Sequence, residues 1–125
     1  MSEAIRITPE LLRGMPLPEP SGSVDKKARG SVLVVAGSVE VPGAALLAGT
    51  AALRAGAGKL QIATCSSVAL HLGLAVPEAL VLGLPETPSG GIRPESADLL
   101  CERSKRNDAV LLIRRRTSPA WSASS

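Results

Sequence analysis

The chain has 125 residues, 45% of them apolar, with a single Trp and no Phe or Tyr. This predicts one domain with a core of small and branched aliphatic side chains, and it leaves no aromatic platform on which nucleic-acid bases could stack. The net charge of +3 comes from Arg114, Arg115 and Arg116, because residues 1–113 hold eleven basic and eleven acidic side chains. Nucleic-acid binding needs many phosphate contacts, so this charge distribution argues against it.

The cysteines and the apolar stretches indicate the compartment. Cys65 and Cys101 form no CxxC pair and have no histidine at metal-ligand spacing, which predicts two reduced thiols and no metal site. The amino terminus lacks the basic and apolar regions of a signal peptide, and the longest apolar stretch, residues 43–53, is too short to span a bilayer. We therefore expect a cytoplasmic protein that does not bind a membrane.

The first predicted element is a short helix. Thr8 is suited to the N-cap and Pro9 to the first helical position, and apolar residues follow. Prolines at positions 16, 18 and 20 and the Ser-Gly-Ser that follows cannot continue this helix, so an extended linker is expected there.

A strand, a loop and a helix come next. Residues Ser31–Ala36 form a continuous, largely β-branched run, as in a strand buried on both faces of a parallel sheet. A loop over residues 37–42 leads into a helix predicted for Gly43–Ala55, whose small side chains would let it approach the sheet closely. Gly56 and Gly58 are expected to end that helix.

The second strand is predicted at Lys59–Thr64. Ser66 and Ser67 offer an N-cap for a short helix that continues through Leu74.

The remaining elements repeat this alternation. A third strand is predicted at Ala79–Leu82, a Gly- and Pro-rich loop at 85–94, a helix at Pro94–Arg106 and a fourth strand at Ala109–Ile113. Alternating strands and helices predict an α/β fold, with a parallel sheet and flanking helices.

The loop between Gly37 and Gly43 is the candidate ligand site. It follows a strand and precedes a helix, and ligands of open α/β sheets bind beyond the carboxyl ends of the strands. No Lys-Ser/Thr pair follows the second glycine, so the loop is not a P-loop, and the glycine spacing does not fit GxGxxG. The pattern by itself is equally consistent with a ligand loop and with a plain connection.

Other polar residues give weaker signals. His71, the only histidine, is better explained by a surface or packing role than by catalysis. Glu78 is either a ligand contact or a turn residue, and Asp98 and Glu102 indicate a solvated helix face. The pattern predicts no catalytic residue and no metal ligand.

Taken together, four blocks resemble the opening of the NAD(P)H-hydrate dehydratase family. They are Lys27–Ser38, Pro42–Ala48, the Arg-Ala-Gly-Ala-Gly ending of Ala51–Gly58, and Pro77 with Glu78. The resemblance extends over residues 5–113. It identifies residues 1–113 as the amino-terminal half of a dehydratase domain, and hence as an incomplete ribokinase-like fold.

The resemblance also implies an activity. The family carries out ADP-dependent dehydration of (S)-NAD(P)H hydrate to NAD(P)H, a repair of damaged nicotinamide nucleotides, with ADP or ATP and Mg as the nucleotide co-substrate and metal. The small-molecule substrate is therefore NAD(P)H hydrate, and family members are often homo-oligomeric. Carried over by motif, Gly37, Ser38, Gly43 and Ala44 would line the substrate site, and Glu78 is a less certain substrate contact.

The sequence leaves the family pattern after Ile113. The family continues there with Gly-Pro-Gly, whereas this chain has Arg114, Arg115 and Arg116. The later motifs, including Gly-x-Gly-Asp with the catalytic aspartate and most nucleotide-binding elements, have no counterpart. Residues 114–125 are thus expected to be a non-homologous, disordered tail. A frameshift explains this tail economically, and a divergent short protein is the alternative.

Three functions therefore stay open at the level of sequence. The first is the dehydratase, with the chain inactive on its own and poorly soluble or partly molten. The second is a sugar or vitamin kinase of the ribokinase-like superfamily. The third is a non-enzymatic, vestigial fragment whose arginine tail binds an acidic partner.

Overall fold

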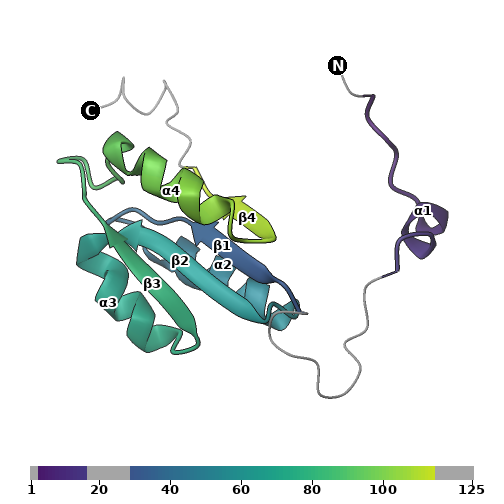
Figure 1. Ribbon diagram of the computed structural model, residues 1–125, viewed down its shortest axis with the longest axis horizontal. Helices are drawn as coiled ribbons and strands as arrows, with labels where there is room; N and C mark the ends of the chain where they lie inside the picture. The colour runs from purple at the N-terminus through teal and green to yellow at the C-terminus, as the bar shows by residue number, and fades with distance from the viewer. Residues whose placement is uncertain (1–2, 17–28, 115–125) are drawn as a thin grey trace.

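A parallel four-stranded sheet forms the centre of the molecule. The computed structural model describes residues 3–16 and 29–114. The strands lie in the order β3-β2-β1-β4, and every pairing is parallel (Figure 1). Their bounds are β1 Ser31–Val35, β2 Lys59–Cys65, β3 Ala79–Leu84 and β4 Ala109–Leu112. The predicted α/β class is confirmed, while the expected linker and most of the expected tail lie outside the described residues.

Helices cover both faces of this sheet. Helices α2 (Gly43–Arg54) and α3 (Ser66–Ala75) pack on one face, and α4 (Ala97–Ser104) lies on the other (Figure 1). The predicted 94–106 helix begins as a short 3-10 turn, η1 (Pro94–Ser96), and ends at Ser104. The helix predicted after Gly43 ends as expected, since Gly56 has a φ of 107°.

The core has two parts, one on each face of the sheet. The part under α2 and α3 consists of Val34, Ala36, Ala45, Ala48, Leu60, Ile62, Leu72 and Val76. The part on the α4 side consists of Leu33, Val35, Ala63 and Leu84, with Leu100 packed against it. The predicted close approach of α2 is confirmed at Gly49, where an added Cβ would lie 2.8 Å from Ile62 Cδ1.

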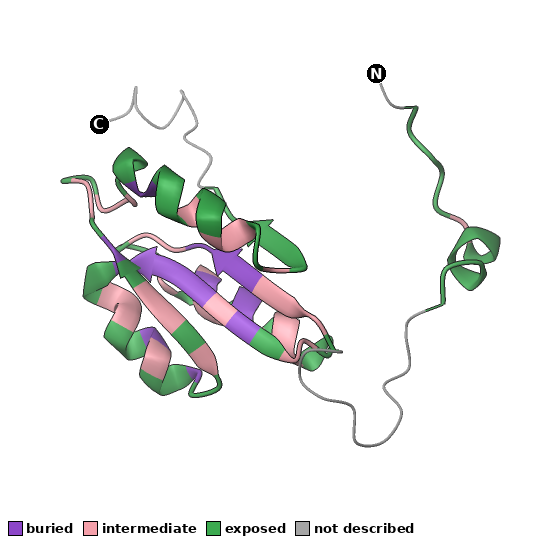
Figure 2. Ribbon diagram, in the orientation of Figure 1, coloured by how far each residue is buried: buried purple, intermediate pink, exposed green. Residues whose placement is uncertain are grey.

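Strand β4 pairs with β1 and forms a poorly covered edge of the sheet. All four of its residues are exposed, including Val110 at 46% and Leu112 at 67% (Figure 2). At its start, Asp108 Oδ2 accepts hydrogen bonds from the Ser31 amide at 2.7 Å and from the Ser31 hydroxyl at 3.1 Å. The strand is therefore held at one end by polar contacts and presents an apolar edge elsewhere.

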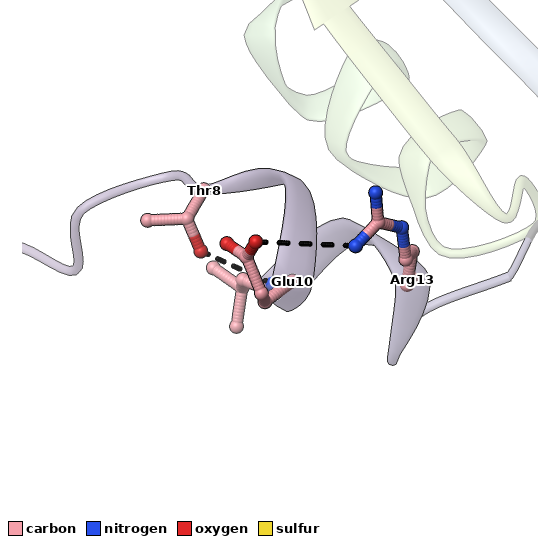
Figure 3. Close-up of polar contacts among 4 residues, drawn as sticks. Thr8, Glu10 and Arg13 are labelled. Atoms are coloured by element: carbon pink, nitrogen blue, oxygen red, sulfur yellow. Dashed lines mark hydrogen bonds and ion pairs between the residues drawn. The ribbon is translucent and has the colours of Figure 1, made fainter.

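The predicted amino-terminal helix is confirmed as α1 (Pro9–Arg13). Thr8 Oγ1 accepts a hydrogen bond from the Leu11 amide at 3.2 Å, and Glu10 and Arg13 form an ion pair at 3.9 Å (Figure 3). No residue of α1 is buried, and the helix lies apart from the sheet (Figure 1).

The expected serine N-cap of α3 is wrong. Cys65 occupies the N-cap position in an extended conformation, and its side chain does not cap the helix. Ser66 is already the first helical residue, and the carboxylate of Glu86 accepts hydrogen bonds from the Ser67 amide at 2.5 Å and from the Ser66 hydroxyl at 3.3 Å. The hydrogen-bond acceptor at the start of α3 therefore comes from the loop after β3 and not from the adjacent serines.

None of the helices in residues 3–16 and 29–114 is long and apolar enough to cross a bilayer.

Candidate functional site

Two adjoining cavities open at the carboxyl end of β1. The larger one, of about 460 Å³, is lined by Val35, Ala36, Gly37, Ser38, Ser89, Gly91, Ile92, Leu100, Leu112, Ile113 and Arg114. The smaller one, of about 200 Å³, is lined by Gly37, Ser38, Val41, Ala44 and Ile113. Gly37, Ser38 and Ile113 border both, so three of the predicted site residues, Gly37, Ser38 and Ala44, lie around one hollow.

Gly37 adopts a conformation and a position that only glycine suits. Its φ is 97°, and an added Cβ would lie 2.6 Å from Thr64 Oγ1. Thr64 is fully buried, and within the described part of the chain its hydroxyl has no hydrogen-bond partner. The backbone at Gly37 therefore sits directly over a buried hydroxyl whose hydrogen-bonding capacity is unused.

Ser38 and Ala44 shape the approach to the amino end of α2. Ser38 Oγ accepts a hydrogen bond from the Val41 amide at 3.2 Å, which fixes the turn that leads into the helix. No side chain caps α2, whose N-cap residue is Pro42. The amino end of a helix attracts anions, and Ala44 in the first turn of α2 lines the smaller cavity.

Gly43 and Glu78 lie elsewhere. Gly43 lines a separate apolar cavity of about 450 Å³ between α2 and α3, which His71 also borders. Glu78 is exposed and directly precedes β3, so it sits at the amino-terminal edge of the sheet, opposite the two cavities. The structure does not bring Glu78 together with Gly37 and Ser38, and its role as a substrate contact stays a prediction.

Sequence reasoning missed the second wall of the larger cavity. Ser89, Gly91 and Ile92 come from the loop after β3, and Arg114 extends from the end of β4. The loop is rich in Gly and Pro and follows a strand, so the rule that located the first loop applied to it too. Among the described residues, Arg114 is the only charged one that lines this cavity, and it belongs to the segment predicted to be a non-homologous tail.

Two titratable groups close to the cavities have shifted pKa values. Burial, reinforced by the nearby charge of Glu86, raises the pKa of the Cys65 thiol, so this thiol is poorly nucleophilic. Hydrogen bonds from Ser67 and Ser66 lower the pKa of Glu86, which is therefore a stable anion rather than a proton donor.

The described residues do not fit a metal. No three of their His, Cys, Asp or Glu side chains gather closely enough to hold an ion. The Mg implied by the resemblance has no ligand set in the described part of the chain.

The fold defines the class of protein. A ribokinase-like superfamily protein from Enterococcus faecalis superposes with a TM-score of 0.62 at 24% identity, over 82% of this chain and 32% of that one. The ADP/ATP-dependent NAD(P)H-hydrate dehydratase of Bacillus subtilis, co-crystallised with ATP and Mg²⁺, superposes with a TM-score of 0.57 at 31% identity, over 90% and 48% of the two chains. The sheet and its helices are thus part of a ribokinase-like fold.

The sequence comparisons define the family. Residues 32–112 match the family model of the NAD(P)H-hydrate dehydratases, and the chain belongs to this family. The ADP-dependent (S)-NAD(P)H-hydrate dehydratase of Xanthomonas campestris is 62% identical over 86 residues, which cover 69% of this chain and 29% of that relative. The chain thus spans less than a third of the length of that relative. The resemblance inferred from the four sequence blocks is confirmed.

Proposed function

We propose that this chain provides the amino-terminal wall of the substrate site in an ADP-dependent NAD(P)H-hydrate dehydratase. The hydrated nicotinamide nucleotide would lie in the hollow around Gly37 and Ser38, with an anionic group against the amino end of α2 near Ala44. The observation that carries the proposal is that two cavities share Gly37 and Ser38 directly beside an uncapped helix amino end. That surface suits a phosphate-bearing ligand.

The relatives support this choice over a sugar or vitamin kinase. The Xanthomonas campestris protein is named for its action on (S)-NAD(P)H hydrate and its dependence on ADP, and it is 62% identical over the matched segment. The described residues contain no cluster for Mg, so the metal that accompanies ADP would be held by residues outside them. The contribution of this chain would be to position the hydrated nucleotide and to exclude water.

A chimera tests the proposal. Residues 29–113 of this chain replace the matching segment of the Xanthomonas campestris dehydratase, and ADP-dependent recovery of the dihydronicotinamide absorbance is followed with NADH hydrate and NADPH hydrate. We expect the chimera to be active and the separate 125-residue chain to be inactive. A folded chimera that binds ADP but turns over neither hydrate would contradict the proposal.

An Ala44→Leu variant of the chimera locates the substrate. The larger side chain would fill the smaller cavity, so KM for the hydrate is expected to rise about tenfold or more while ADP affinity is kept. The matched control is Leu47→Ala, on the same helix at a side chain that is 72% exposed. Equal effects of the two variants on KM would place the substrate elsewhere.

A further inference from the structure

The loop after β3 contains a closed turn over residues 86–92, called here the 86–92 turn. Glu86 and Ile92 form an isolated antiparallel bridge, and the Thr87 amide donates to the Gly91 carbonyl at 2.8 Å. The Gly90 amide donates to the Thr87 carbonyl at 2.9 Å, and the Gly91 amide donates to Thr87 Oγ1 at 3.0 Å. These bonds join the residues of the turn into one hydrogen-bonded unit.

One end of the turn is fixed to α3. The Glu86 carboxylate accepts hydrogen bonds from the Ser67 amide at 2.5 Å and the Ser66 hydroxyl at 3.3 Å. A carboxylate at a helix amino end is stabilised both by the amide and by the helix dipole. Because α3 has no cap of its own, Glu86 supplies what the local sequence lacks.

The other end of the turn is fixed to the loop over residues 37–42. The Gly90 carbonyl accepts a hydrogen bond from the Val39 amide at 2.9 Å and lies 3.5 Å from the Cys65 thiol, which donates to it. The two segments are in close contact, since an added Cβ on Gly90 would lie 3.3 Å from Val39 Cβ. The 86–92 turn therefore connects the start of α3 to the loop that borders both cavities.

We infer that Glu86 is a positioning residue for the substrate loop: by capping α3 it holds the 86–92 turn, and through the Gly90–Val39 hydrogen bond it fixes Gly37 and Ser38. The inference rests on the proposed function, because that function makes the 37–42 loop a substrate loop. Glu86 lines neither cavity, so its effect on the substrate is exerted through the turn. Ser89 and Gly91 of the same turn do line the larger cavity, so both walls would shift together.

Hydrogen exchange in the full 125-residue chain tests the connection directly. Glu86→Ala removes both acceptor contacts, and Glu86→Gln keeps one neutral acceptor. Glu95→Ala is the matched control, at an exposed glutamate nine residues after Glu86. Peptides over 37–42 and 66–70 should exchange about tenfold faster in Glu86→Ala, less in Glu86→Gln, and unchanged in Glu95→Ala, while β1 and β2 keep their protection.

Each other result overturns the inference. Faster exchange throughout the sheet would mean that Glu86 only supports the fold, and unchanged exchange at 37–42 would mean that the turn transmits nothing. If the Val39 amide of the wild-type chain is not protected from exchange, the hydrogen bond from Val39 to the Gly90 carbonyl is not formed. This measurement needs no turnover, so an inactive chimera would count against the proposed function and leave the exchange result intact.

The kinetic consequence is measured in the chimera. Glu86→Ala should raise KM for the hydrate about tenfold and change kcat by less than about twofold, with partial recovery in Glu86→Gln. A loss confined to kcat, or an equal effect of Glu95→Ala on KM, would contradict a positioning role for Glu86.

Discussion

Gly37 and Gly43 bracket the candidate substrate loop but respond to different constraints. At Gly37 a side chain would meet both a positive φ of 97° and a Thr64 Oγ1 atom at 2.6 Å. At Gly43 an added Cβ meets nothing within 4 Å, and the residue begins a helix. Only the first glycine is therefore required by its surroundings.

This difference predicts opposite effects of one substitution. Gly37→Ala should destabilise the chimera by about 2 kcal/mol, because an alanine at positive φ is strained and its Cβ collides with Thr64. Gly43→Ala should stabilise it by about 0.5 kcal/mol through the lower entropy of the unfolded chain. Urea unfolding of the two variants measures both values, and equal values would show that the loop relaxes freely around Gly37.

Thr64 presents a separate test, since its hydroxyl is buried and without a partner in the described residues. Thr64→Val keeps the shape and removes the polar atom, so the free energy of unfolding should stay unchanged or rise by about 1 kcal/mol. A loss of more than about 1 kcal/mol on urea unfolding of the chimera would show that the hydroxyl is hydrogen-bonded. Reduced affinity for the hydrate with unchanged stability would place a ligand atom on Thr64.

At the scale of elements, local patterns predicted most of the structure. Three elements could be predicted because their signals lie between neighbours in the sequence. They are β1, from its apolar run, α2, from its small residues, and α1, from its Thr8–Pro9 start. The cap of α3 was not predictable in this way. It depends on Glu86, which is 19 residues from Ser67. The prediction that Ser66 or Ser67 would be the N-cap was therefore wrong.

The pairing of β4 with β1 has a polar clamp that should respond to acid. Hydrogen bonds from the Ser31 amide and hydroxyl lower the pKa of the Asp108 carboxyl. The clamp contributes stability above the ordinary aspartate pKa, and this contribution is lost as pH falls through the lowered pKa of the folded state. Thermal unfolding of the chimera should show this loss, and Asp108→Asn should show a smaller dependence on pH in the same range. Identical pH profiles would exclude the clamp as a titrating contact.

At the scale of the whole molecule, the sequence predicted one side of the candidate site and not the other. The rule that ligands bind beyond the carboxyl ends of parallel strands pointed to the loop after β1, and the family resemblance selected Gly37, Ser38 and Ala44, which line the smaller cavity. The other side is formed by Ser89, Gly91 and Ile92. Their position could not be predicted without the path of the loop after β3 over the sheet. The same rule names the edge on which ligands bind, and Glu78 lies at the opposite edge, where a motif match was the only reason to select it.

The exposed β4 edge leads to a prediction about the separate 125-residue chain. Unpaired backbone groups along an apolar edge strand promote pairing with other copies, and Leu112 of β4 is 67% exposed. Leu112→Lys should therefore increase the monomeric fraction in size-exclusion chromatography. Leu70→Lys is the matched control. Leu70 lies on α3 and is 72% exposed, so this substitution removes a similar apolar area away from any strand edge. If the chains associate through the strand edge, Leu112→Lys should raise the monomeric fraction and Leu70→Lys should leave it unchanged. Equal improvement would assign association to exposed apolar area in general, in which case α2 and α3 contribute as much as β4.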